Sequence, residues 1–123
     1  GLGDVYKRQG VWWDPKDNLF KMWYHAGWMR GTGLATSEDG INWIRPTLDV
    51  VPGTNLVLVN REGYRRDGCC VWLDHSTLNP EERFKMFQFF RYANNGEIGE
   101  IYSSADGGCY CLFSPWNLLF RNG

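Results

Sequence analysis

The sequence predicts an all-β protein built from two related units, each a small antiparallel sheet. The chain of 123 residues holds 15 glycines, 7 tryptophans, 7 phenylalanines and 6 tyrosines. Aromatic residues favour strands, and glycines favour the turns between strands. No window shows a sustained helical period. The strongest observation is an internal repeat, whose copies lie 60 to 67 residues apart.

Three short stretches recur in the same order along the chain. They are VWWD and VWLD, FKM and FKM, and SEDGINW and SADGGCY, which begin at Val11 and Val71, Phe20 and Phe84, and Ser37 and Ser104. The separation between the copies grows along the chain, as it would if loops lengthen between fixed elements. Three matches in one order make a chance similarity a poor explanation.

Each copy divides into four short strands separated by turn-forming residues. We expect the first strand at 11–13 and 70–73, the second at 20–25 and 83–90, and the third at 33–37 and 98–104. The first turn is DPKDN in one copy and HSTLNPEE in the other, and both are rich in residues that favour turns. The Asn-Pro-Glu-Glu stretch from Asn79 also predicts one helical turn. After an Asp-Gly turn, the fourth strand carries Trp43 or Tyr110.

Units of four antiparallel strands that repeat at this separation are typical of a β-propeller. The two units, at about 10–46 and 67–115, would be two four-stranded blades. A closed ring needs at least about four blades. We therefore expect residues 10–123 to be a truncated part of a larger propeller. Residues 1–9 resemble a translated sequencing-library adapter and would lie outside the fold, with an ordinary polar strand as the alternative.

Charge and composition exclude some classes of partner. The net charge of −1 argues against a nucleic-acid partner. No apolar run approaches the roughly 20 residues needed to span a membrane. The four cysteines lack the spacing of a zinc site, so we expect small buried side chains and no metal. Cys69 and Cys70 are neighbours and would point to opposite faces of a strand. Two isolated units would expose sheet edges and an apolar face, so we expect self-association.

The stretch Ser-x-Asp-Gly-x-x-Trp resembles the Asp-box of sialidases and related propellers, with one spacer residue missing before the glycine. The resemblance implies that Asp39 and Asp106 hold their turns through hydrogen bonds to the backbone. It also implies that Trp43 and Tyr110 pack between sheets.

A larger resemblance rests on VWWDPKDNLFKMWYHAG, GLATSEDGINWIRP, RRDGCCVWLD, ERFKMF and YSSADG. These stretches resemble five-bladed propeller glycoside hydrolases of the arabinanase and β-fructosidase type, families 43 and 32. The resemblance implies hydrolysis of O-glycosidic bonds in poly- or oligosaccharides by carboxylates facing the central channel, without a cofactor. It favours a periplasmic or extracellular location. The alternative is a non-catalytic carbohydrate-binding or scaffold propeller, and we expect the two units alone to cleave no glycoside.

Asp67 is the catalytic candidate that this resemblance implies. Arg66-Asp67-Gly68 is similar to the Arg-Asp-Pro motif of β-fructosidases, whose aspartate orients the sugar and stabilises the transition state. Gly68 replaces the proline, and one extra residue precedes the valine of the following strand. A surface-turn aspartate is the alternative.

Side chains suited to sugars surround this motif in the sequence. Tyr64, Arg65 and Arg66 end the predicted loop 60–66, and tyrosine and arginine suit sugar hydroxyls and carboxylates. Trp28 is the candidate for stacking on a sugar ring, while the other tryptophans in the matching stretches are expected to be mostly core. A solvated loop is the alternative for the whole group.

Four further acidic residues are candidates for a functional role because they either recur in both repeats or flank a strand. Asp14 and Asp74 occupy the same place before a turn, and we expect them to serve that turn. Glu97 and Glu100 flank the third strand of the second unit. Either could act as a general acid in principle, but a solvated strand edge is the expectation.

Overall fold

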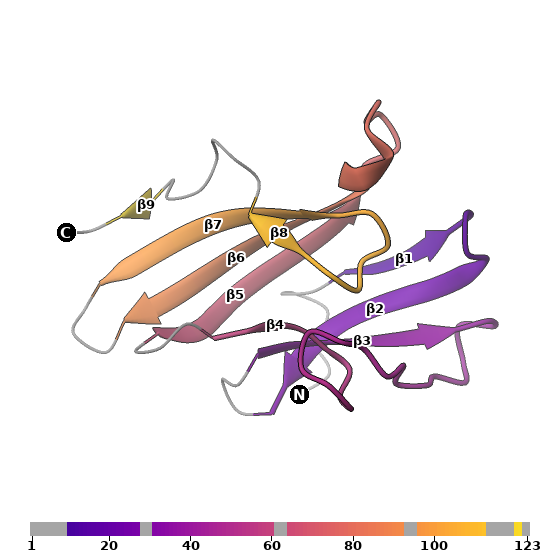
Figure 1. Cartoon of the computed structure of the whole chain (residues 1–123), viewed down its shortest axis with the longest axis horizontal. Coiled ribbons are helices and arrows are strands. Elements are labelled where there is room, and N and C mark those ends of the chain that lie inside the picture. The colour runs from indigo at the N-terminus through magenta and orange to yellow at the C-terminus, as the bar shows by residue number, and fades with distance from the viewer. Residues whose placement is uncertain (1–9, 28–30, 61–63, 93–95, 113–119, 122–123) are drawn as a thin grey trace.

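The computed structural model describes residues 10–27, 31–60, 64–92, 96–112 and 120–121. They form two antiparallel sheets that lie one against the other (Figure 1). Within these ranges the single helical element is a 3₁₀ turn, η1, at Pro80–Glu82. The all-β prediction is therefore confirmed, and so is the strand assignment of both Phe-Lys-Met stretches. Two packed sheets are established, and their membership of a propeller stays a prediction.

The first sheet has four strands and the second has five. The first follows the order β1 (Val11–Asp14), β2 (Leu19–Ala26), β3 (Gly31–Ser37) and β4 (Leu56–Val59). The second follows the order β5 (Tyr64–Leu73), β6 (Phe84–Tyr92), β7 (Glu97–Ser104) and β8 (Cys111–Leu112). A further strand, β9 (Phe120–Arg121), also pairs with β7.

The turns form where the sequence places turn residues. Asp14 accepts a hydrogen bond from the backbone N–H of Lys16 at 3.0 Å, and Asp74 accepts one from Ser76 at 2.9 Å. The predicted turn role of both aspartates is confirmed. The side chain of Asn79 caps η1 by accepting from the backbone N–H of Glu81 at 3.0 Å. The predicted helical turn is also confirmed.

The fourth strand differs from the prediction in both units. Trp43 lies outside any strand, and the next residue forms a single bridge, Thr36↔Ile44. The equivalent pair in the second unit is Ser103↔Cys111, at the start of β8. Trp43 and Tyr110 thus hold equivalent places, as predicted, each one residue before the bridging residue.

The other half of the fourth strand comes later in the chain. β4 pairs with the beginning of β3, and β9 pairs with the beginning of β7. Each unit therefore covers the edge of its third strand with two short segments instead of one strand. The first unit accordingly extends to Val59, past its expected end at about residue 46.

Strand alternation gives each sheet two faces of different composition. We call one the Trp-Asp-Lys face, which comprises Trp12, Asp14, Lys21 and Trp23 in the first sheet and Trp72, Asp74, Lys85 and Phe87 in the second. We call the other the Phe-Met face, which comprises Val11, Trp13, Phe20 and Met22 in the first sheet and Val71, Leu73, Phe84 and Met86 in the second. Each residue of one set is the repeat equivalent of its counterpart in the other sheet.

The two sheets pack head to tail, with the Trp-Asp-Lys face of the first against the Phe-Met face of the second. Phe84 and Met86 are 0% exposed, whereas their repeat equivalents Phe20 and Met22 are only partly buried. The same Phe-Lys-Met phrase is therefore covered in the second sheet and uncovered in the first. Identical residues differ in burial because, in the part of the chain that the structure describes, another sheet lies on the Phe-Met face of the second sheet and not on that of the first.

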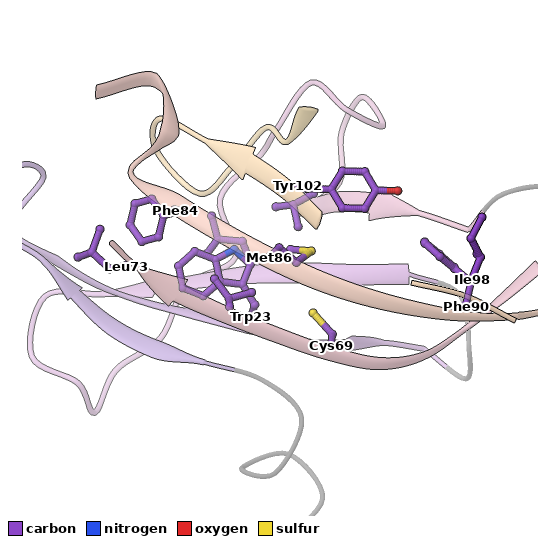
Figure 2. Packing of buried hydrophobic residues seen from close by; sticks show 11 residues of the cluster. Trp23, Cys69, Leu73, Phe84, Met86, Phe90, Ile98 and Tyr102 are labelled. Carbon is purple, nitrogen blue, oxygen red and sulfur yellow. The ribbon is translucent and has the colours of Figure 1, made fainter. Parts of the chain in front are cut away.

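Trp23 is the centre of this interface. Its side chain is fully buried and points into the layer of Phe84 and Met86 (Figure 2). The rings of Trp23 and Phe84 lie 5.3 Å apart, and the indole N–H donates to the carbonyl of Gly107 at 2.8 Å. The indole N–H of the first repeat and the carbonyl of the second thus satisfy each other's hydrogen bond, which fixes the second Asp-Gly turn against the first sheet.

Candidate functional site

Asp67 lies inside β5, at an irregularity of the strand between Arg66 and Cys69. Its carboxylate binds the guanidinium of Arg91 on β6, with Nε 2.8 Å from Oδ2. The Asp67 side chain is 25% exposed and that of Arg91 is 62% exposed. Arg65 and Arg66 lie close to Asp67 in the sequence, but the ion pair with Arg91 depends on the pairing of β5 with β6.

The expected loop before the inner strand is shorter than predicted. Tyr64, Arg65 and Arg66 lie within β5, which pairs with the end of β6 as far as Tyr64. The physical reason is aromatic packing, because the ring of Tyr64 meets that of Phe90 edge-on at 6.5 Å. Tyr64 is therefore partly committed to the core, while Arg65 is exposed.

Two of the predicted substrate-binding side chains cannot be placed. Trp28 and the side chain of Arg66 lie outside the described residues. Of the sugar-binding candidates, the described part of the chain brings Arg65 and Asp67 to one end of β5. Arg65 lies directly across from Arg91 in the strand register.

Glu97 joins this group through the register of the next strand. It is the antiparallel partner of Arg91, and side chains of directly opposed residues lie about 5 Å apart at Cβ. Asp67, Arg91 and Glu97 thus form a row across β5, β6 and β7, which we call the Asp67 row. Strand spacing puts the backbones of the two acidic residues about 10 Å apart, with Arg91 on the strand between them.

Glu100 was expected at a solvated strand edge, and that expectation is wrong. Its side chain is 0% exposed. The register places it across from Gln88, which is also fully buried and lies against Thr32 of the first sheet. Glu100 therefore belongs to the interface between the sheets. The alternation of β7, which buries Ile98 and Tyr102 on that same face, is the sequence pattern that could have identified it.

A second charged group crosses the interface between the sheets. Asp14 is fully buried, and Lys21 donates to its carboxylate at 2.9 Å. Arg83, from the second sheet, binds the same carboxylate through its guanidinium. We call these three residues the Asp14 cluster. Burial raises the pKa of Asp14, but hydrogen bonds from Arg83 and Lys21 outweigh it and lower the pKa to about 2.

The second sheet repeats the lysine–aspartate pair of the Asp14 cluster without the arginine. Lys85 donates to Asp74 at 3.0 Å, as Lys21 does to Asp14, and this hydrogen bond lowers the pKa of Asp74. The Asp74 side chain is 29% exposed, in contrast to the buried Asp14. The sequence repeat of aspartate and lysine could have predicted both pairs, but not the arginine that completes only the first.

The two Asp-Gly turns are held as the Asp-box resemblance implies. Gly40 donates to Ser37 Oγ at 2.8 Å, and Gly107 donates to Ser104 Oγ at 2.9 Å. Asp39 accepts from the backbone of Asn42 and Ile41, each at 2.8 Å, and these bonds hold its pKa well below the usual range. The second turn matches, because Asp106 accepts from Gly108 at 2.8 Å.

The aromatic residues that follow the two Asp-Gly turns, Trp43 and Tyr110, differ in how they pack against the core. Tyr110 packs against the core, and burial raises its pKa well above the usual value. Its hydroxyl is buried without a hydrogen-bond partner among the described residues. Trp43 is partly buried and lies outside the core cluster. The implied packing between sheets is thus seen for Tyr110.

The cysteines only partly follow the prediction. All four are free thiols, and Cys69 is buried while the other three are exposed. Cys69 and Cys70 do point to opposite faces of β5, and Cys70 is exposed on the outer face. Within the described ranges, no three histidine, cysteine or acidic side chains gather as metal ligands. No helix in those ranges is long and apolar enough to cross a membrane.

No family model, curated protein or solved structure matches this chain.

Proposed function

We propose that the chain is part of a glycoside hydrolase-like β-propeller that acts on O-glycosidic bonds of poly- or oligosaccharides. The head-to-tail packing of two equivalent units supports the propeller, since blades of a ring meet through unlike faces in the same way. The resemblance of the sequence to arabinanase- and β-fructosidase-type hydrolases supports the activity.

The observation that carries the proposal is the Asp67 row. A carboxylate accepts hydrogen bonds from sugar hydroxyls, and an arginine donates to them. Glycoside hydrolysis uses two carboxylates several ångströms apart, and Asp67 and Glu97 lie on the two strands that border the strand of the exposed Arg91. In this proposal Asp67 orients the sugar and offsets the positive charge of an oxocarbenium-like transition state.

A second candidate function is carbohydrate binding without catalysis. The ion pair between Asp67 and Arg91 favours it, because a carboxylate held by a guanidinium at 2.8 Å is well placed to recognise hydroxyls. Under this alternative the Asp67 row binds carbohydrate, and no residue of this chain takes part in catalysis.

Sugar binding can be measured on the chain itself by NMR titration with arabino- and fructo-oligosaccharides. We expect amide shift changes near Asp67, Arg91 and Glu97, and their loss in Arg91→Gln. Arg45→Gln removes an exposed arginine elsewhere and is the matched control. Amide shift changes that are as large in Arg91→Gln as in the wild-type chain would contradict the proposed site.

Catalysis is tested in a longer protein that carries this chain. Asp67→Asn should lower kcat by roughly a hundredfold, the range for losing one electrostatic stabiliser. Asp39→Asn should lower stability and leave kcat nearly unchanged, because Asp39 serves its turn. If Asp67→Asn weakens binding in a protein that shows no turnover, the binding function replaces the catalytic one.

A further inference from the structure

Each sheet has one Trp-Asp-Lys face and one Phe-Met face. One face of each kind meets the other between the sheets, and the remaining face of each kind points outward. The Phe-Met face of the first sheet is uncovered, with Val11 47% and Trp13 41% exposed. Among the described residues no other sheet lies on the Trp-Asp-Lys face of the second sheet, where Trp72 and Phe87 are only partly buried. The internal interface therefore defines what each uncovered face is shaped to receive.

We propose that the Trp-Asp-Lys face of the second sheet docks onto the Phe-Met face of the first sheet of another copy of this chain. The contact would repeat the internal head-to-tail interface between molecules. Because the two faces are unlike, the contact is heterologous, and every added copy leaves one face of each kind free. The expected product is an open or ring-closed series of copies.

The charged groups of the uncovered face match what a second copy offers. Inside the chain, the Lys21 ammonium donates to the backbone carbonyl of Asp106 at 2.8 Å, in the second Asp-Gly turn. Lys85, which is itself buried and donates to Asp74 and to the carbonyl of Glu82, is the equivalent ammonium in the second sheet. Asp39 in the first Asp-Gly turn provides the equivalent carbonyl. The two turns share their hydrogen bonds, so the first can take the place of the second.

The shape of that turn also fits. Gly107 packs against Trp23, and a Cβ on it would collide with the indole ring. The equivalent residue of the first turn is Gly40, which likewise has no side chain. The turn of a second copy can therefore approach Phe87, the repeat equivalent of Trp23, as closely as the internal one approaches Trp23.

Two substitutions between the repeats make contact between copies weaker than the internal one. Leu19 stands where Arg83 does, so a second copy brings no guanidinium to Asp74. Cys70 stands where Gly10 does, and a Cβ on Gly10 would collide with the carbonyl of Val71. The docked sheets must therefore move apart slightly at that corner. Both differences can be reversed by mutation, which provides a test by gain of affinity.

Complementary blocking tests the head-to-tail geometry by sedimentation velocity on the whole chain. Trp13→Glu places a charge on one face and Phe87→Glu on the other, and circular dichroism with thermal melting checks that both variants fold. The wild-type chain should form a concentration-dependent series, and each variant alone should be a monomer. An equimolar mixture should form a one-to-one dimer, because each variant keeps the face that the other lacks.

Other outcomes of this experiment overturn the proposal. A wild-type chain that stays monomeric at its highest soluble concentration has no such interface. Single variants that each still form a dimer indicate that like faces associate, and a mixture that stays monomeric shows that the two unlike faces do not bind each other. Folded single variants that keep the wild-type series indicate association through sheet edges or another surface.

A substitution that strengthens the contact between copies tests which residues meet in it. Leu19→Arg supplies the missing guanidinium and should lower the dissociation constant by about tenfold, as a hydrogen bond to a charged group does. Adding Asp74→Asn should cancel the gain. Val50→Arg adds the same charge away from both faces and is the matched control. An equal gain with Val50→Arg, or a gain that survives Asp74→Asn, would contradict the docking geometry.

Discussion

Replacing Asp14 with asparagine should destabilise the chain far more than the same change at Asp74. Both aspartates bind a lysine and cap an equivalent turn. Asp14 is fully buried and also binds Arg83, so its loss leaves the buried Lys21 to the partly exposed Asp17 and the partly buried Arg83 to the carbonyl of Ala105. Removing one partner from a buried ion pair costs about 3–5 kcal/mol. The partly exposed pair at Asp74 should contribute much less, because solvent screens it.

The assay is urea unfolding with the melting temperature as a second readout. We expect Asp14→Asn to lower the melting temperature by roughly 10 °C, from about 3 kcal/mol in a domain of this size. Asp74→Asn should lower it by only a few degrees. Equal losses in the two variants would refute the claim that the first sheet's charged face is buried by the second.

The same cluster predicts a dependence on pH. Asp14 has a lowered pKa of about 2 against an ordinary value of 3.8. Its contribution is therefore fully present above about pH 4 and is lost as the pH falls through about 2. The wild-type unfolding free energy should drop more steeply than that of Asp14→Asn over this window. Parallel pH profiles would contradict the ionised, doubly paired state of Asp14.

The remaining predictions compare matched positions. Gly107→Ala should cost about 3 kcal/mol, because its φ of 83° is strained for alanine and its Cβ would collide with Trp23. Gly53→Ala should cost only about 1 kcal/mol, since its φ of 79° is similar but no atom lies within 4 Å of the added Cβ. Phe84→Ala should cost about 3–5 kcal/mol, and Phe20→Ala less than half of that, because only Phe84 is covered. Urea unfolding checks all four, and equal costs within either pair would contradict the packing described.

The repeated phrases predicted the secondary structure well because they are local. The Phe-Lys-Met strands, the Asp-Gly turns and the cap at Asn79 all depend on neighbouring residues, and all formed where expected. The split fourth strand was missed because β4 follows a loop of several residues after Trp43. Its pairing with β3 depends on chain return, which no local pattern specifies.

The charged groups show where sequence alone was insufficient. The roles of Asp14 and Asp74 in their turns were predicted, yet nothing local distinguished the buried aspartate from the exposed one. That difference arises from which face receives a neighbouring sheet. Glu100 was misjudged for the same reason, and the partner of Asp67 is Arg91, 24 positions away in a neighbouring strand.

Nuclear Overhauser contacts of the Trp23 indole test the central claim, that the two repeats pack through unlike faces. The indole proton should show contacts to Gly107 and the ring of Phe84, since the nitrogen lies 2.8 Å from the Gly107 carbonyl. In the monomeric Phe87→Glu variant, where no second copy can dock, the indole of Trp13 on the opposite face of the same sheet should show contacts to Phe20 and none to the second sheet. Contacts from Trp13 to Phe84, with none from Trp23, would contradict the head-to-tail arrangement.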